Sequence, residues 1–305
     1  KAPKYYIIKW LTDYIRKYGI DGYRADTVKH VGPDVWAEFS KQCDIAFADW
    51  KAAHPDKVLD DNGFFTVAEV YNYGVSTKNL FDIGDRKIDY FENGFDALIN
   101  FEAKYDATQP YDEVFKRYSN TMKVMPGKTV LNYLASHDDG SPYDKKREKT
   151  YEAAVRLLLL PGISQVYYGD ETARPLDIPG TIGDATLRSF MNWGDLAKPE
   201  TKALLAHWQK LGTFRRNHPA VGAGEHKMVA EKPYMFSRTY QKYDYRDVVL
   251  IGLDLPKGTK KIDVYKTFAD GIKVRDAYSG KTALVENQSI TFDSPYSIIL
   301  LEEVK

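Results

Sequence analysis

The fold can be argued from one stretch of the sequence, Gly22-Tyr23-Arg24-Ala25-Asp26-Thr27-Val28-Lys29-His30. The run 20–24 is too short for a helix and follows a glycine, so it predicts a buried strand that ends by presenting Arg24 and Asp26. In a parallel α/β barrel, the loops after the strands carry the chemistry. The stretch therefore predicts a barrel strand that delivers a carboxylate and a cation to a functional site.

Two further predicted strands end in the same way. The β-rich run 64–70 contains Glu69, and the run 129–135 leads into His137 and Asp138. Taken alone, an Arg-x-Asp pair is usually a structural ion pair, a glutamate that ends a strand is usually solvated, and His-Asp before Asp-Gly is usually a turn. Three acids at three strand ends favour a carboxylate glycosidase, which needs a nucleophile and an acid/base on either side of the scissile bond.

Between these strands, apolar residues recur at three- and four-residue spacing, which is typical of amphipathic helices. The first predicted helix, 4–18, ends at Gly19 and has one apolar face, which is made of Tyr6, Ile7, Trp10, Leu11, Tyr14, Ile15 and Tyr18. The alternation of strands and helices predicts a parallel sheet. Further helices are predicted at 33–50, 111–122, 149–160 and 200–217, and further strands at 95–101 and 163–168.

The pattern changes after residue 219. Short alternating runs, separated by Lys-Gly, Asp-Gly and Ser-Gly turns, occur at 234–240, 248–253, 262–265 and 297–301. Such runs are typical of an antiparallel β-sandwich. We therefore predict two domains, an α/β barrel portion over 1–219 and a β-sandwich over 220–305.

Composition excludes some classes of function. The 43 basic residues equal the 43 acidic residues, so no net field favours nucleic acid or an anionic membrane. Cys43 is the single cysteine, which excludes an intrachain disulfide and a cysteine metal cluster. The sequence contains no apolar run long enough to span a bilayer. Its 23 tyrosines suit either a protein that stacks on sugar rings or an ordinary core.

Taken together, these motifs resemble the α-amylase family, glycoside hydrolase family thirteen. The segments 22–30, 67–70 and 137–138 match its catalytic motifs in order and in placement at strand ends. Pro161-Gly162-Ile163, leading to 167–171, resembles the eighth barrel strand, and Arg188 with Met191 and Trp193 resembles the loop that follows it. The resemblance implies a partial TIM-type (β/α)8 barrel, strands four to eight, followed by a small antiparallel β-sandwich.

The resemblance also implies roles for the acids. Asp26 is expected to be the nucleophile, Glu69 the general acid and base, and Asp138 the third acid, which grips hydroxyls of the distorted sugar. Arg24 lies two residues before Asp26 and so on the same side of the strand, where it would aim the nucleophile. His137 is expected to hydrogen-bond the same sugar.

Secondary roles follow from the same resemblance. Lys29 and His30 are expected on the leaving-group side, and the backbone carbonyl of His30 is a candidate ligand for a structural Ca²⁺ ion. Tyr71, Tyr73 and Trp193 are expected either to stack on glucose rings or to pack the loops. The remaining histidines are not grouped at metal-ligand spacing, and we interpret them as structural or solvated.

The implied function is that of a retaining α-glucan hydrolase that cleaves α-1,4-glucosidic bonds of starch or maltooligosaccharides through a covalent glycosyl-enzyme on Asp26. Alternatives are a transglycosylase, a cyclomaltodextrinase or neopullulanase-type enzyme, a glucan-binding fragment that is inactive without its N-terminal half, and a non-catalytic amylase-like subunit.

The sequence contains no counterpart of the first three barrel strands of the family. An open barrel would expose strand edges, so we expect a partner that supplies the N-terminal half, either as a separate chain or as a lost segment. We expect that the protein binds no nucleic acid and has no membrane span. We expect a secreted, periplasmic or cell-surface location rather than a cytoplasmic one.

Overall fold

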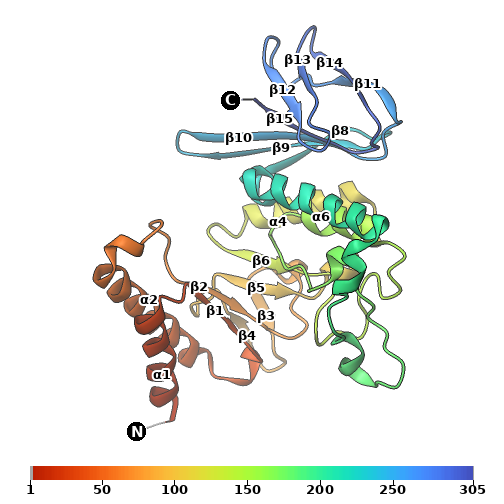
Figure 1. The fold of residues 1–305 in the computed structure, drawn as a ribbon. Coiled ribbons are helices and arrows are strands. Elements are labelled where there is room, and N and C mark those ends of the chain that lie inside the picture. Colours follow the sequence, from red (N-terminus) through yellow and green to blue (C-terminus); the bar gives the residue numbers. More distant parts are fainter. Residues whose placement is uncertain (1–2, 305) are drawn as a thin grey trace. The chain divides into compact units, whose positions relative to one another are not determined.

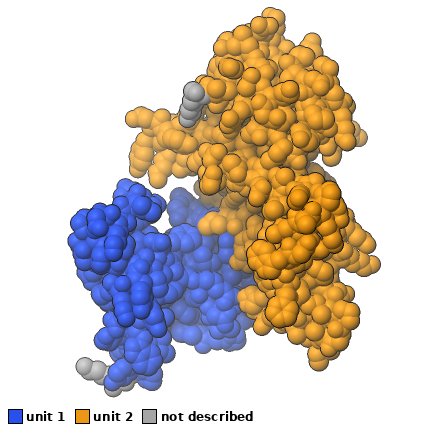
Figure 2. All heavy atoms as spheres, viewed as in Figure 1, with its two compact units in different colours: residues 1–103, 124–132 blue, residues 104–123, 133–305 orange. Residues whose placement is uncertain are grey.

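The computed structural model describes residues 3–304 and forms two compact units (Figure 2). The first unit contains the chain up to Ala103 together with Val124–Asn132, and the second contains Lys104–Lys123 together with the chain from Tyr133 onward. The short helix α3 (Ala103–Asp106) marks one passage between them.

A parallel sheet forms the centre of the first unit (Figure 1). Its strands lie in the order β1 (Gly22–Ala25), β2 (Phe65–Ala68), β5 (Ala97–Asn100) and β6 (Thr129–Asn132), and each neighbouring pair is parallel. All four residues of β5 are buried, as expected of an inner strand that is covered on both faces. The parallel α/β arrangement predicted from the sequence is confirmed.

Helices α1 (Pro3–Tyr18) and α2 (Pro33–Ala53) lie side by side in this unit (Figure 1). Helix α1 ends as predicted at Gly19, which has a φ of +66° and donates its N–H to the Ile15 carbonyl at 2.8 Å. A side chain at Gly19 would be strained, and a Cβ there would lie 2.3 Å from the Trp50 ring.

Helix α1 buries Ile8, Thr12 and Ile15, and Ile8 and Ile15 lie in one core with α2. Most of the predicted apolar face is exposed in the described chain, with fractions between 51% and 60% for Tyr6, Ile7, Trp10, Tyr14 and Tyr18. Apolar residues occur on both faces of α1, so spacing alone could not show which face α2 covers.

The segment 71–90 contains a small hairpin. Strands β3 (Leu80–Asp82) and β4 (Lys87–Asp89) pair in antiparallel register. Asp82 accepts the Gly84 N–H at 2.8 Å, which closes the turn. Strands of three residues are too short to give a recognisable alternation. Single 3₁₀ turns also lie in this unit, at Val28–His30, Pro55–Lys57 and Val75–Thr77.

The second unit contains a helical part. Helix α6 (Pro199–Asn217) buries Leu204, Trp208, Leu211 and Phe214 along one face. The strand predicted over 163–168 is shorter in the structure, where β7 covers Ile163–Ser164. The other helices are α4 (Tyr111–Lys123), α5 (Thr150–Leu158) and α7 (Pro219–Ala223), with 3₁₀ turns at Asp170–Thr172, Gly183–Leu187 and Trp193–Ala197.

The antiparallel part of the second unit is built from two sheets. One has the strand order β13-β12-β15-β10-β9-β8 and the other pairs β11 with β14. Apolar residues of both sheets, such as Leu250 and Ile290, form one core. The strands are β8 (Glu225–Ala230), β9 (Met235–Lys242), β10 (Tyr245–Gly252), β11 (Gly258–Asp263), β12 (Lys273–Asp276), β13 (Thr282–Leu284), β14 (Ser289–Ser294) and β15 (Ile299–Glu303).

A fully buried arginine joins the helical and antiparallel parts. Arg238 of β9 donates to the Leu159 carbonyl at 2.6 Å, just after α5, and also to the Val221 carbonyl in α7. Desolvation lowers the pKa of Arg238 to about 9. The guanidinium satisfies carbonyls at helix ends that otherwise lack partners.

A histidine makes a second connection. His218, between α6 and α7, contacts Asp247 of β10 at 2.8 Å and Glu302 of β15 at 2.6 Å. Desolvation by itself would lower the pKa of His218, but these two carboxylates raise it to about 9. His218 is therefore charged at neutral pH and ties the helices to two strands.

Candidate active site

Arg24 holds two of the predicted catalytic carboxylates. Its Nη2 lies 3.3 Å from Oε2 of Glu69, and its Nη1 contacts Oδ1 of Asp26. The pairing of β1 with β2 continues beyond the strand ends, because Glu69 donates its N–H to the Ala25 carbonyl at 2.9 Å. The sheet register therefore delivers Asp26 and Glu69 to the same guanidinium.

The two carboxylates differ in exposure. The Asp26 side chain is 63% exposed, whereas that of Glu69 is 14% exposed. The N–H of Thr27, whose φ is +48°, donates to Oε2 of Glu69 at 3.0 Å. Both contacts of the Glu69 carboxylate within the described chain use Oε2, so Oε1 is the oxygen that a ligand can reach.

Lys29, His30 and Tyr71 border one hollow of about 510 Å³ in the first unit, whose wall also includes the β3–β4 turn. The Lys29 ammonium lies 4.8 Å from the centre of the Tyr71 ring, a favourable cation–π distance. Tyr71 is exposed and packs its edge against Phe101. These predicted substrate-side residues are thus neighbours.

Tyr73 does not have the stacking role that was offered for it. Its side chain is fully buried, and its hydroxyl donates to the Lys78 carbonyl at 2.7 Å. Tyr73 therefore packs the loop, as the alternative interpretation held.

In the second unit, Arg188 binds both residues of the predicted His-Asp motif. Its Nη2 contacts Oδ1 of Asp138, and its Nε donates to the His137 carbonyl at 3.1 Å. His137 Nε2 lies 2.8 Å from Oδ2 of Asp138. Asp138 is thus held from two sides while its side chain stays partly exposed.

The neighbouring Asp139 is a structural anchor. Its carboxylate accepts bonds from Lys104, from the Tyr133 hydroxyl and from the Ser141 N–H. Desolvation raises the pKa of Asp139, but these bonds outweigh it and bring the pKa below its ordinary value. The hydrogen bonds of Asp139 hold this turn, so the Asp138 carboxylate is not needed there and is available for a ligand.

A buried arginine fixes the loop that carries Arg188. Arg174 is fully buried, stacks at 3.7 Å over the Tyr168 ring, and donates to the carbonyls of Leu187 and Ser189 on either side of Arg188. No role was predicted for Arg174, and Arg188 was noted only within a matching loop. Both lie far from 137–138 in sequence, so no local spacing could join them to that motif.

Trp193, the remaining predicted site residue, is exposed at the start of a 3₁₀ turn in the second unit. The structure therefore gathers Arg24, Asp26 and Glu69 in the first unit, and His137 and Asp138 in the second. The convergence of Asp138 with the other two acids stays a prediction.

Calcium binding at the His30 carbonyl stays a prediction. Residues 3–304 contain no group of three or more His, Cys, Asp or Glu that could hold a metal ion. Ca²⁺ takes six to eight oxygens, and the His30 carbonyl would be one of them. Within the same residues, no helix is long and apolar enough to cross a bilayer.

Comparisons place the chain among known proteins. No family model matches it. It is 37% identical over 243 residues to the periplasmic alpha-amylase of Escherichia coli strain K12, covering 78% of this chain and 34% of that protein. It is 24% identical over 273 residues to a cyclomaltodextrinase of a Bacillus species, covering 83% and 42%. The chain thus spans less than half the length of either relative.

Solved structures agree in fold. The alpha-amylase of Geobacillus thermoleovorans, complexed with acarbose, matches with a TM-score of 0.65 at 18% identity. The match covers 99% of this chain and 64% of that one.

Proposed function

Because the chain belongs to the α-amylase family, we propose that it serves a retaining α-glucan hydrolase that cleaves α-1,4-glucosidic bonds of starch or maltooligosaccharides. One observation carries the proposal: Asp26 and Glu69 share the Arg24 guanidinium at the ends of two adjacent parallel strands. A retaining mechanism requires two carboxyl groups that flank the scissile bond, about 5–5.5 Å apart.

Asp26 is the nucleophile in this proposal. Its carboxylate is the more exposed of the two, so a sugar can approach it. An Asp26 oxygen attacks the anomeric carbon while the bond from that carbon to the leaving-group oxygen breaks, which gives a covalent glycosyl-enzyme. Arg24 aims the carboxylate before the attack.

Glu69 is the general acid and then the general base. It gives a proton to the leaving-group oxygen in the first step. In the second step it takes a proton from water as that water attacks the anomeric carbon and releases Asp26. The Thr27 N–H and Arg24 fix Oε2, so Oε1 exchanges the proton.

Asp138 and His137 are proposed to bind hydroxyls of the same sugar, with binding that tightens in the transition state. Arg188 supports this role because it orients both residues. No step in the mechanism runs through calcium.

We further propose that β1, β2, β5, β6 and β7 are strands four to eight of a (β/α)8 barrel whose other strands come from an N-terminal portion. Two features support the existence of this N-terminal portion. Within the described chain, β1 pairs with β2 alone, and α1 exposes a row of aromatic side chains. Open strand edges and large apolar patches are normally covered.

The deciding experiment measures reducing-sugar release from soluble starch, by this chain alone and with an N-terminal barrel portion restored. We expect activity on restoration, and its loss in Asp26→Asn. Asp61→Asn, an exposed aspartate outside the site, is the matched control and should keep activity. Activity that survives Asp26→Asn would refute the nucleophile assignment. A restored protein that binds starch but does not cleave it would favour the glucan-binding alternative.

A second candidate activity is action on cyclodextrins or transfer to a sugar acceptor. The name of one relative, a cyclomaltodextrinase, favours it. Chromatography of the products from starch, maltotriose and a cyclodextrin distinguishes the activities, because transfer yields products longer than the substrate.

We also propose export to the periplasm or beyond, as the name of the Escherichia coli relative suggests. Fractionation of cells that express the full-length protein tests this. Recovery in the cytoplasm alone would contradict it.

A further inference from the structure

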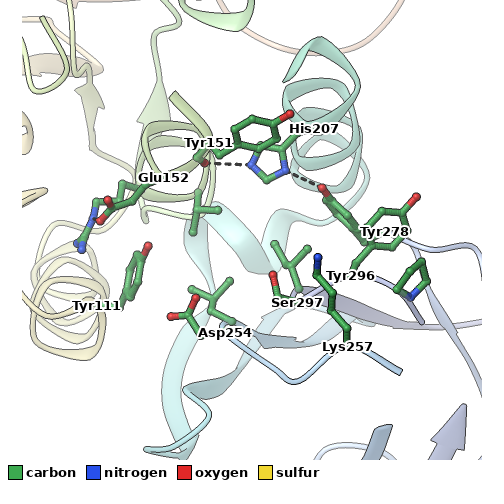
Figure 3. Close-up of a pocket in the computed structure, with 14 residues that line it drawn as sticks. Tyr111, Tyr151, Glu152, His207, Asp254, Lys257, Tyr278, Tyr296 and Ser297 are labelled. Carbon is green, nitrogen blue, oxygen red and sulfur yellow. Dashed lines mark hydrogen bonds and ion pairs between the residues drawn. The ribbon is translucent and has the colours of Figure 1, made fainter. Parts of the chain in front are cut away.

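The second unit contains a tyrosine-lined hollow of about 680 Å³ that none of the predicted site residues borders (Figure 3). This volume falls within the range typical of ligand pockets, roughly 300–1,000 Å³. We call it the tyrosine pocket. Its walls come from α4, α5 and α6 and from connections between the β-strands, and the aromatic residues are Tyr111, Tyr151, Tyr278 and Tyr296.

A histidine makes one wall rigid. The Tyr151 carbonyl can only accept, so His207 Nε2 donates to it at 3.0 Å, and His207 Nδ1 accepts from the Tyr278 hydroxyl at 2.7 Å. Desolvation lowers the pKa of His207, and it raises the pKa of Tyr278 to about 12. Both groups are neutral at working pH, and the wall is formed before any ligand arrives.

The opposite wall is equally fixed. Tyr111 stacks on Tyr234 with ring centres 5.9 Å apart, and the Arg156 guanidinium lies 4.0 Å from the Tyr111 ring centre. Arg156 is held in turn by Glu152 at 2.8 Å and by the Gln109 carbonyl at 2.7 Å. In Figure 3, Tyr111 and Glu152 lie on one side of the hollow and Tyr278 and Tyr296 on the other.

The charges of the pocket cancel. Glu152 and Asp254 are acidic, and Arg156 and Lys257 are basic. A balanced set does not select an anion or a cation, but it offers hydrogen-bond acceptors and donors around the rim. Such a rim suits a neutral ligand that carries many hydroxyl groups.

Two of the rings that border the hollow are partly exposed. Tyr151 is 48% exposed although its ring also contacts His207, and Tyr296 is 38% exposed although its ring also contacts Tyr278 and the Lys210 ammonium. Exposed aromatic rings are amphipathic contact surfaces, with an apolar face and a polar hydroxyl. A pyranose ring is their complement, because its C–H face is apolar and its edge carries hydroxyls.

We propose that the tyrosine pocket is a second carbohydrate-binding site that holds a segment of α-glucan chain. The choice of α-glucan among neutral carbohydrates rests on the proposed function. In this proposal the pocket holds substrate and does no chemistry, since one of its two carboxylates, that of Glu152, is bound in an ion pair with Arg156.

Calorimetric titration of the Asp26→Asn chain with maltoheptaose tests the site, since that variant prevents turnover. Tyr296→Ala and Tyr151→Ala should each remove one equivalent of bound maltoheptaose or weaken it at least ten-fold. Tyr151 holds His207 through its backbone carbonyl, so Tyr151→Ala keeps that bond. The matched control is Tyr243→Ala, a tyrosine that is 88% exposed and does not border the pocket.

Two further comparisons sharpen the test. Tyr296→Phe keeps the ring and should bind within about two-fold of the parent, which separates lost stacking from a disturbed fold. Cellohexaose, a β-linked chain, should bind at least ten-fold more weakly than maltohexaose. Unchanged stoichiometry and affinity in both alanine variants would overturn the proposal, as would tighter binding of cellohexaose.

The outcomes separate this inference from the proposed function. Tyrosine-dependent binding without hydrolysis by the restored enzyme would retain the second site and refute the catalytic proposal. Hydrolysis together with binding that does not depend on the tyrosines would support the catalytic proposal and refute the second site.

Discussion

Arg24 on β1 reaches across to Glu69 at the end of β2, where its Nη2 lies 3.3 Å from Oε2 of the glutamate. The same guanidinium contacts Asp26. One cation therefore sets the relative position of both carboxylates, and its removal should affect both steps of the proposed reaction.

We predict that Arg24→Lys lowers kcat of the restored enzyme about 100-fold with a smaller change in KM, because a single ammonium cannot bind two carboxylates in the fork geometry of arginine. Steady-state kinetics on maltoheptaose measure this. Arg16→Lys, on α1, is the control and should leave kcat unchanged. An Arg24→Lys variant with normal kcat would show that the guanidinium has no positioning role.

Arg188→Met should release Asp138 and the His137 carbonyl together. We predict a loss of about 10-fold in kcat/KM, smaller than the loss in Asp138→Asn, since the carboxylate remains but is no longer oriented. Arg216→Met, at the end of α6, provides the comparison. If Arg188→Met and Asp138→Asn lose activity equally, Arg188 binds substrate itself.

The stability of the second unit should depend on pH through His218. Its folded pKa of about 9 lies above the ordinary histidine value of 6.5, so its contribution is complete below about pH 6.5 and is lost as the pH rises through 9. Glu302 has a lowered pKa, because hydrogen bonds from His218 and Arg275 outweigh desolvation, so its contribution is lost at acid pH. Tm should therefore fall between pH 6.5 and 9.5.

The variant His218→Gln tests whether His218 causes this fall in Tm. We expect it to destabilise the protein by about 1–2 kcal/mol at pH 6 and to flatten the alkaline fall in Tm. His54→Gln, in the first unit, is the control. An alkaline fall that persists in His218→Gln would mean that another group is responsible.

Arg238→Met should destabilise the second unit by about 2–4 kcal/mol, because it leaves the Leu159 and Val221 carbonyls buried without their donor. Urea unfolding gives the value. Arg246→Met, on the exposed side of β10, should cost less than about 0.5 kcal/mol. Equal effects from the two variants would contradict the account of Arg238.

The sequence predicted most elements, and the misses have physical causes. Strands such as 95–101 were found because buried parallel strands are continuous apolar runs. The face of α1 that α2 covers could not be predicted, because apolar residues lie on both faces of that helix. The β3–β4 hairpin was missed because three-residue strands carry no pattern.

The candidate site was also predicted only in part. Arg24, Asp26 and Glu69 were identified because each lies at or just after the end of a predicted strand, and the sheet register then brings them together. The contacts of Arg188 and Arg174 were not predicted, because they span 50 and 13 residues of chain through loops whose path no local rule describes.

The aromatic row on α1 has an optical consequence. Trp10 is 60% exposed, so water surrounds much of its indole ring and its emission should lie at long wavelength. A protein that covers this helix would remove that water and shift the fluorescence to the blue. Trp10 is thus an intrinsic probe with which assembly of the barrel can be titrated without any label.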